Sequence, residues 1–248
     1  MPAFRQEQTI LEDIRALASA LAETSYDYEL IVVVDGEVDR TARRARRATT
    51  DHIRVLSYSQ NQGKGHAVRH GMLQADGDVI GFMDAGGELP PKAISHLLTQ
   101  LLEHRADMVV GSKRHPNSAV SYPLVRHAYS WGYQMLTRLL FGLNVRDTQV
   151  GLKLFRREVV DKALPLLLVK RFAFDIEFLA VAHTMGFKRL EEAPVTLQHN
   201  FSSTIDLQAV WHMLWDTAAV FYRLRILNYY QRKAKEVPSL TNPSPSDS

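Results

Sequence analysis

The sequence contains no cysteine. This absence excludes a disulfide framework and thiolate chemistry. The sequence also lacks an uninterrupted run of the ~18 apolar residues that a membrane-spanning helix needs. Neither sign of charge dominates, since 30 Lys and Arg residues stand against 27 Asp and Glu residues. The net charge of +3 favours anionic partners only in general terms. No aromatic residues interleave with the basic cluster at residues 43–47, so we expect no nucleic-acid partner.

The 248 residues, 46% of them hydrophobic, are enough to build one globular core, and no internal repeat divides them. We predict one domain over residues 1–204 and a C-terminal amphipathic helical segment over residues 205–236. The Pro- and Ser-rich tail at residues 237–248 is predicted to be disordered. No secretory signal pattern opens the sequence, so we expect a cytoplasmic protein.

Residues 61–91 carry the pattern around which the rest of the sequence is organised. A glycine-rich, basic turn around Lys64 precedes a helical stretch, and the apolar run at residues 79–83 predicts a buried strand. Asp84 follows this strand at its carboxyl end, where ligands bind in open α/β sheets. On spacing alone, Asp84 suits a metal or phosphate site and an ordinary turn equally well.

This stretch resembles the core of the family 2 glycosyltransferases of GT-A type, which include the dolichol-phosphate mannose and glucose synthases. The family pattern N-x-G-K-G-x-A-x-x-x-G, G-D and D-A-D is matched at Asn61, Gly63, Lys64, Gly65, Ala67, Gly71, Gly77, Asp78, Asp84 and Ala85. Gly86 replaces the second Asp of D-A-D, and Glu88 stands where related synthases carry an extra metal ligand. The resemblance implies an α/β GT-A fold with a mostly parallel sheet flanked by helices. It also implies that Lys64, Asp84 and Ala85 bind the donor, and that Asp84 and Glu88 hold Mg²⁺ or Mn²⁺.

Residues 30–34 form a continuous apolar run, as expected for a parallel strand buried on both faces. The run leads into Asp35, which matches the second Asp of the family pattern V-D-D-G-S, while Val34 replaces the first. In relatives, acids at this position hydrogen-bond the base or ribose of the nucleotide. The resemblance therefore implies that Asp35 also binds the donor.

The beginning of the sequence resembles the end of a family strand. Pro2, Ala3 and Ile10 fit the motif P-A-Y-N-E-x-x-x-I, which in relatives closes a buried strand near the middle of the sheet. We expect the first strand to be missing because the chain starts late, and an in-frame apolar segment upstream in the DNA would support this. The alternative is a sheet that tolerates the loss and leaves backbone pairing groups exposed.

A second group of candidates follows the strand predicted after the acidic turn. Lys113 and Arg114 come directly after that strand, and Arg126 and Ser130 lie four residues apart on a helix predicted over residues 122–141. This region resembles the acceptor site of polyprenyl-phosphate glycosyltransferases, where Arg and Ser bind the lipid phosphate. The planar guanidinium group suits phosphate oxygens. A basic surface helix is the alternative interpretation.

Two more motifs of the dolichol-phosphate synthases are present. D-T-x-x-G-x-K-x-F covers residues 147–155, and F-D-x-E begins at Phe174. Asp147 and Asp175 are flanked by apolar residues and would need partners if buried. The resemblance implies that either can approach the sugar, so the candidate catalytic residues are these two and Asp84. The Glu that closes the second motif is expected to form a structural ion pair.

Residues 205–233 predict one long or broken helix with aromatic and basic residues interspersed. Charges at Asp216, Arg223 and Arg225 exclude a plain transmembrane span. An amphipathic helix resting on a membrane surface fits the pattern, and a helix that only caps the core fits equally well.

Together the motifs imply an inverting transferase that moves a hexose from a nucleoside diphosphate sugar, of UDP-glucose or GDP-mannose type, to a polyprenyl or dolichyl phosphate. We expect it at the cytoplasmic face of a membrane as a peripheral protein, and a separate membrane-protein partner is an open option. One alternative is a transferase with a hydroxyl acceptor, which would need Asp175 as a base. The other is a catalytically weak homologue that only binds nucleotide sugar or lipid phosphate, which Val34 and Gly86 favour.

Overall fold

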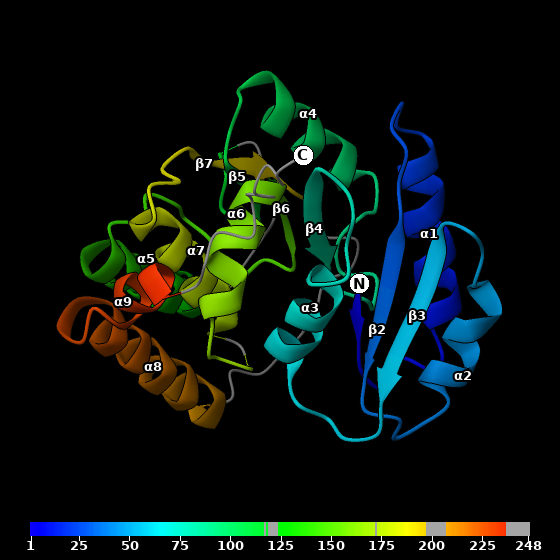
Figure 1. Cartoon of the computed structure of the whole chain (residues 1–248), viewed down its shortest axis with the longest axis horizontal. Helices are drawn as coiled ribbons and strands as arrows, with labels where there is room; N and C mark the ends of the chain where they lie inside the picture. The colour runs from blue at the N-terminus through cyan, green and yellow to red at the C-terminus, as the bar shows by residue number, and fades with distance from the viewer. Residues whose placement is uncertain (117, 119–123, 172, 197–206, 237–248) are drawn as a thin grey trace, which may run out of the picture.

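The computed structural model describes residues 1–116, 118, 124–171, 173–196 and 207–236, with backbone only at 124–130 and 207–210. The described strands are β1 (Pro2–Ala3), β2 (Leu30–Asp35), β3 (Ile53–Tyr58), β4 (Val79–Met83), β5 (Met108–Ser112), β6 (Leu152–Arg156) and β7 (Leu190–Pro194). They form two sheets, β1-β2-β3 and β4-β6-β5-β7. The first is parallel, whereas β6 runs antiparallel to β4 and β5 in the second. The α/β architecture is as predicted, but the strands divide into two sheets (Figure 1).

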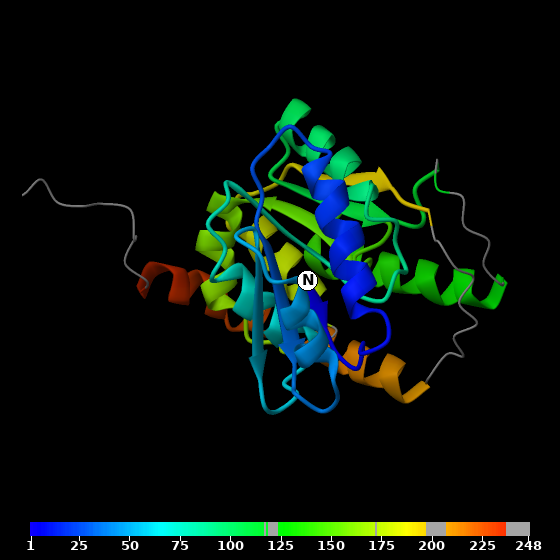
Figure 2. The ribbon, with the colours of Figure 1, turned by 90° about the vertical axis from the view of Figure 1, so that its right-hand side faces the viewer.

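Helices surround both sheets (Figures 1 and 2). The α-helices are α1 (Ile10–Ala22), α2 (Thr41–Ala45), α3 (Lys64–Met72), α4 (Ala93–Glu103), α5 (Leu124–Phe141), α6 (Arg157–Ala163), α7 (Phe174–Thr184), α8 (Leu207–Phe221) and α9 (Tyr229–Glu236). Two 3₁₀ turns, η1 (Arg46–Ala48) and η2 (Leu164–Leu166), and a π-helix, η3 (Tyr222–Ile226), complete the described elements. None of the helices in these ranges has the length and hydropathy needed to cross a bilayer.

Strand β2 is covered on both faces, which explains its continuous apolar sequence. Ile31 and Val33 pack with residues of α3 on one face. Val32 and Val34 pack with residues of α1 on the other. A strand buried on both faces cannot show an alternating pattern, so the sequence run was a reliable sign of its position.

The first strand is present only as the two residues of β1. Pro2 pairs with Val33 and Ala3 with Val34, parallel to β2. The Ala85 amide at the end of β4 donates a hydrogen bond to the Pro2 carbonyl at 3.3 Å. The sequence predicted that the first strand is missing, whereas the structure has this short strand beside β2, with a hydrogen bond to the end of β4.

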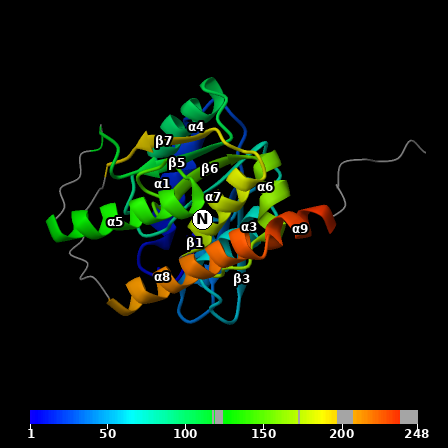
Figure 3. The ribbon, with the colours of Figure 1, turned by 90° about the vertical axis from the view of Figure 1, so that its left-hand side faces the viewer.

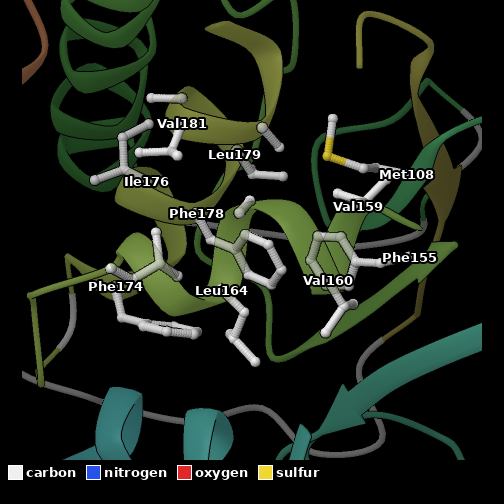
Figure 4. Packing of buried hydrophobic residues seen from close by; sticks show 14 of the residues in the cluster. Met108, Phe155, Val159, Val160, Leu164, Phe174, Ile176, Phe178, Leu179 and Val181 are labelled. Carbon is white, nitrogen blue, oxygen red and sulfur yellow. The ribbon is translucent and has the colours of Figure 1, made fainter. Parts of the chain in front are cut away.

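The largest core lies between the second sheet and α6 and α7 (Figure 4). The rings of Phe155 and Phe178 stack there with their centroids 4.3 Å apart. Residues 174–182 of α7 are all buried, including Asp175 and Glu177. A helix buried all round places its polar residues inside the protein, so these two carboxylates require partners.

The C-terminal helices pack on this core (Figure 3). Val220, Leu224 and Tyr230 are buried in the main cluster, and the Tyr230 hydroxyl donates to Glu177. The helix predicted over residues 205–233 is therefore broken, with η3 between α8 and α9. Its treatment as a separate segment at 205–236 stays a prediction, and the tail at 237–248 lies outside the described residues.

Candidate active site

Four charged side chains lie in series at the junction of the two sheets and are called the charge chain below. Asp84 follows β4, Lys64 begins α3, Asp175 lies in the first turn of α7, and Lys153 lies in β6. Lys64 Nζ lies 2.7 Å from Asp84 Oδ2 and 3.8 Å from Asp175 Oδ2. Lys153 Nζ lies 2.7 Å from Asp175 Oδ1. Acids and ammonium groups thus alternate, so each charge is neutralised by a neighbour.

The inner pair of this chain is fully enclosed. The side chains of Lys153 and Asp175 are 1% and 4% exposed. Lys153 also donates to the Val150 carbonyl at 2.6 Å. Burial lowers the pKa of Lys153, and the carboxylate of Asp175 opposes that shift. The pair holds Asp175 in one orientation at the inner end of the site.

Sequence reasoning missed the role of Lys153. The signal was present, because this Lys occupies a strand position between Leu152 and Leu154 where a charge is out of place. The partner is 22 residues away in the sequence, and no local pattern connects the two.

Lys64 connects the inner pair to Asp84. Burial lowers its pKa, but the carboxylates of Asp175 and Asp84 outweigh burial and raise the pKa of Lys64 to about 12. The preceding Gly63 has φ +101°, a conformation that favours glycine. The G-K motif therefore aims a permanently charged ammonium group into the site.

Asp84 has one oxygen available for a ligand. Its Oδ2 accepts from Lys64, while its Oδ1 is buried and has no hydrogen-bond partner within the described ranges. Burial raises the pKa of Asp84, and the Lys64 ammonium opposes that shift. The carboxylate packs against Gly151, where an added Cβ would overlap it. A buried carboxylate oxygen without a donor suits a bound cation.

The second predicted metal ligand, Glu88, forms an ion pair with Lys113. Within the part of the chain that the structure describes, no group of three or more His, Asp or Glu side chains could hold a metal by themselves. Mg²⁺ needs only one or two carboxylates when substrate phosphates and water complete its coordination. Asp84 thus fits a divalent ion that binds together with a diphosphate, and the contribution of Glu88 stays a prediction.

Asp35 organises the loop that carries Lys64. Its carboxylate accepts hydrogen bonds from the Tyr58 hydroxyl, the Asn61 side chain and the backbone amides of Gln62 and Gly63, at 2.8–2.9 Å. The side chain is buried, and both of its oxygens have donors. Its predicted contact with the nucleotide stays a prediction, because such a contact must share or replace these bonds.

Asp147 lies apart from the charge chain, in the loop before β6. Its Oδ1 accepts from the Gln149 amide at 3.2 Å, and its own amide donates to Glu192. Burial raises its pKa. Among the described residues, Asp147 forms no hydrogen bond or ion pair with Asp84 or Asp175. Its predicted approach to the sugar stays a prediction.

The predicted acceptor residues are described only in part. Lys113 follows β5 and pairs with Glu88, while Arg114 donates to the Arg146 carbonyl at 3.1 Å. The side chains of Arg126 and Ser130 lie outside the described residues. Lys113 and Glu88 connect the loop after β5 to the loop after β4, so one acceptor candidate lies beside a predicted metal ligand.

Comparison with known proteins agrees with this arrangement. The family model described as Glycosyl transferase family 2 matches residues 1–164. A dolichyl-phosphate beta-glucosyltransferase of Drosophila melanogaster is 35% identical over 209 residues, which cover 78% of this chain and 64% of that relative. A protein of the same name from Homo sapiens is 30% identical over 219 residues, covering 83% of this chain and 66% of that relative. The chain thus spans slightly less than two thirds of the length of these relatives.

The fold is also that of a solved enzyme. Glucosyl-3-phosphoglycerate synthase from Mycobacterium tuberculosis, solved with Mn²⁺, UDP-glucose and phosphoglyceric acid, superposes with a TM-score of 0.66. The match covers 89% of this chain and 76% of that chain at 21% sequence identity. This likeness confirms the predicted GT-A fold.

Proposed function

From the premise that the chain belongs to glycosyl transferase family 2, we propose that it transfers glucose from UDP-glucose to a dolichyl or similar polyprenyl phosphate. The observation that carries the proposal is the charge chain of Asp84, Lys64 and Asp175 at the carboxyl end of β4. Relatives named dolichyl-phosphate beta-glucosyltransferase support the choice of sugar and acceptor.

The transfer is a single displacement. An oxygen of the acceptor phosphate forms a bond to C1 of glucose while the bond from C1 to the diphosphate oxygen breaks. The leaving UDP keeps the electron pair. An α-linked donor then gives a β-linked product, in agreement with the name of the relatives. The acceptor is already an anion, so the reaction needs no strong general base.

The residues of the site have distinct roles in this proposal. Lys64 lies next to Asp84 with a permanent positive charge and stabilises the negative charge that develops on the diphosphate. Asp175 is held by Lys153 and positions Lys64 from the opposite side. Asp84 orients Lys64 through Oδ2 and keeps Oδ1 for a cation. Mg²⁺ or Mn²⁺, when bound there with the donor, would supply further positive charge to the leaving group.

We also propose that the protein works at a membrane surface. Trp131, Met135 and Leu139 lie four residues apart on α5 and are exposed. Trp211 and Trp215, four apart on α8, are 66% and 69% exposed. Tyr133 of α5 and Thr217 of α8 are hydrogen-bonded, so the two helices lie side by side (Figure 3).

Tryptophan and aliphatic side chains on neighbouring helices suit the interface of a bilayer, where a lipid phosphate is presented. Peripheral binding at the cytoplasmic face, as the sequence predicts, is part of this proposal. A separate membrane-protein partner stays an open option.

A transfer assay with a panel of donors tests the proposal. The chain is incubated with dolichyl phosphate in detergent, with Mg²⁺ or Mn²⁺, and with radiolabelled UDP-glucose, UDP-galactose or GDP-mannose. Label should enter the lipid fraction from UDP-glucose. Asp84→Asn should reduce transfer by about 10²–10³-fold, as expected for the loss of one electrostatic contact to the leaving group.

Glu88→Gln serves as the matched control and should have a smaller effect, because Glu88 is already paired with Lys113. Transfer from GDP-mannose alone would contradict the choice of sugar. Bound nucleotide sugar without transfer to any acceptor would favour a binding protein, and transfer to a sugar hydroxyl would favour the other alternative.

A further inference from the structure

Residues 167–171 follow η2 and are called the bridging segment below. They belong to neither a helix nor a strand, so their backbone N–H and C=O groups need partners from other elements. One set of partners lies on α3. The Arg69 guanidinium donates to the Leu167 carbonyl at 2.8 Å, and the His66 amide donates to the Lys170 carbonyl at 3.1 Å. The bridging segment is therefore bonded to α3 at two places.

The bridging segment also packs directly against the glycine-rich turn that carries Lys64. A Cβ placed on Gly63 would lie 2.5 Å from the Lys170 carbonyl oxygen, closer than atoms pack in proteins. A Cβ placed on Gly65 would lie 2.5 Å from the Cβ of Phe174 at the start of α7. Glycine is needed on both sides of Lys64 because the bridging segment and the start of α7 occupy the space of a side chain. The position of the segment therefore determines the position of the turn.

A second set of partners for the bridging segment comes from α7. Glu177 of this helix is fully buried. Its Oε2 accepts hydrogen bonds from the amides of Leu168 at 3.0 Å and Val169 at 2.8 Å. Its Oε1 accepts from the Tyr230 hydroxyl of α9 at 2.5 Å. Hydrogen bonds to a charged acceptor are stronger than those between neutral groups, so the carboxylate holds the backbone of the segment firmly.

The bonds of Glu177 show that it does more than neutralise a charge. The sequence predicted an ion pair, and Arg223 of η3 lies 3.8 Å from the carboxylate, beyond hydrogen-bond distance. Arg223 donates to the Tyr230 hydroxyl at 3.2 Å. The hydrogen bonds of the carboxylate thus go to backbone amides and to a hydroxyl, which fix position as well as charge.

We propose that Glu177 is a positioning residue for the turn that carries Lys64, and through this turn for binding of the donor. Glu177 holds the amides of the bridging segment, and the Lys170 carbonyl of the same segment holds the His66 amide in the first turn of α3. A displaced segment would move Lys64 relative to the diphosphate, and small displacements in a binding site are costly. The role in donor binding rests on the proposed function.

Hydrogen exchange and UDP binding test this proposal without transfer. Glu177→Met removes the acceptor at similar side-chain length, whereas Glu177→Gln keeps an oxygen for the two amides. Val181→Ala is the matched control, because it removes apolar volume from the same buried helix but no hydrogen bond. Exchange of the His66 amide is scaled to the amides of β2, which report opening of the whole fold.

We expect Glu177→Met to speed the scaled exchange of the His66 amide by at least about tenfold, and Val181→Ala to leave it unchanged. Glu177→Met should also weaken UDP binding, measured by calorimetry with Mg²⁺, by about tenfold. Glu177→Gln should restore both values to within about threefold of the unmodified chain. In the transfer assay, Glu177→Met should raise the KM for UDP-glucose and leave the KM for dolichyl phosphate unchanged.

Tyr230→Phe is the second variant, in case Glu177→Met does not fold. It removes one donor from the carboxylate but keeps both amide bonds, and should speed the His66 exchange by about threefold. Unchanged His66 exchange in the variant that folds, or an equal effect of Val181→Ala, would overturn the proposal. Failure of the unmodified chain to bind UDP would contradict the proposed function, and the His66 exchange would still decide whether Glu177 positions the turn.

Discussion

At the scale of single residues, the candidate site depends on the buried ion pair of Lys153 and Asp175. Lys153 and Asp175 are both enclosed, and within the described part of the chain Asp175 is the ion-pair partner of Lys153. Charges in such an environment depend on each other, because removal of one leaves the other without compensation. The pair therefore contributes to the site by holding the Asp175 carboxylate in place beside Lys64. Loss of the pair should lower the stability of the fold as well as the activity.

Lys153→Met should reduce the free energy of unfolding by about 3–5 kcal/mol, because the Asp175 carboxylate would stay buried without its partner. Urea unfolding measures this. Lys162→Met is the matched control, since Lys162 forms an exposed i,i+4 pair with Glu158. Its removal should cost no more than about 0.5 kcal/mol. Equal losses of unfolding free energy in the two variants would show that the buried pair stabilises the fold no more than the exposed pair does.

Gly151→Ala tests the close packing of Asp84. An added Cβ would overlap the Asp84 carboxylate and displace it, so kcat/KM should fall by about 100-fold. Gly132→Ala provides the control, because a Cβ there meets nothing within 4 Å. That substitution should leave activity unchanged and stabilise α5 by up to about 1 kcal/mol. Full activity of the Gly151 variant would mean that the position of Asp84 is not critical.

The sequence predicted part of this site. Asp84, Lys64 and Asp175 were found from motifs, and the structure brings them together. The use of Asp35 as the anchor of its loop was not predicted, because its donors come from the next strand and loop. The pairing of Glu88 with Lys113 was also not predicted, since the two lie 25 residues apart in the sequence.

At the scale of elements, local sequence patterns predicted where the strands lie but not how they pair. The apolar run at residues 79–83 coincides with β4, and the run at residues 30–34 falls within β2. The antiparallel insertion of β6 between β4 and β5 depends on contacts distant in sequence, which periodicity does not report. The break of the last helix follows from tertiary contacts of Tyr230 and Arg223 with Glu177, which helical spacing cannot show.

The short first strand makes a prediction about pH. Burial lowers the pKa of the Met1 amino group to about 5, from its ordinary value near 8, although Asp84 opposes the shift. Between these values the unfolded chain binds more protons than the folded one, so stability should rise with pH from about 5 to 8. This one group raises the free energy of unfolding by at most about 1.4 kcal/mol per pH unit.

Acetylation of the Met1 amino group should remove its contribution to the increase of the unfolding free energy with pH. Urea unfolding of the acetylated and unmodified chains at several pH values measures the difference, in which contributions from histidines cancel. The acetylated chain keeps an N–H donor for Ile31, so that hydrogen bond is not lost. Parallel curves for the two forms would mean that the amino group is not buried in solution.

At the scale of the whole molecule, the charge chain and the exposed aromatic surface of α5 and α8 have different tasks. In the proposed function, the first holds a diphosphate sugar, and the second brings the protein to a lipid. The double variant Trp211→Ser/Trp215→Ser should weaken binding to vesicles of phosphatidylcholine and phosphatidylserine by at least about tenfold. Flotation measures the bound fraction.

Leu73→Ser is the control for that experiment, because Leu73 is also more than half exposed but lies directly after the end of α3. It should leave vesicle binding unchanged. Transfer of glucose to an acceptor dispersed in detergent should survive the tryptophan changes, since the described bonds of Asp84 and Lys64 do not involve Trp211 or Trp215. Unchanged vesicle binding of the double variant would contradict the membrane surface assigned to α5 and α8.

The most direct test of the proposed function is the identity of the product formed from UDP-glucose and dolichyl phosphate. The lipid fraction is isolated, its acid lability is measured, and the configuration at C1 is determined by NMR. The proposed function predicts an acid-labile β-glucosyl phosphate lipid, formed in equal amount with UDP and strongly reduced in Asp84→Asn. An α-linked product, or a glucose-containing product without a phosphate linkage, would contradict it.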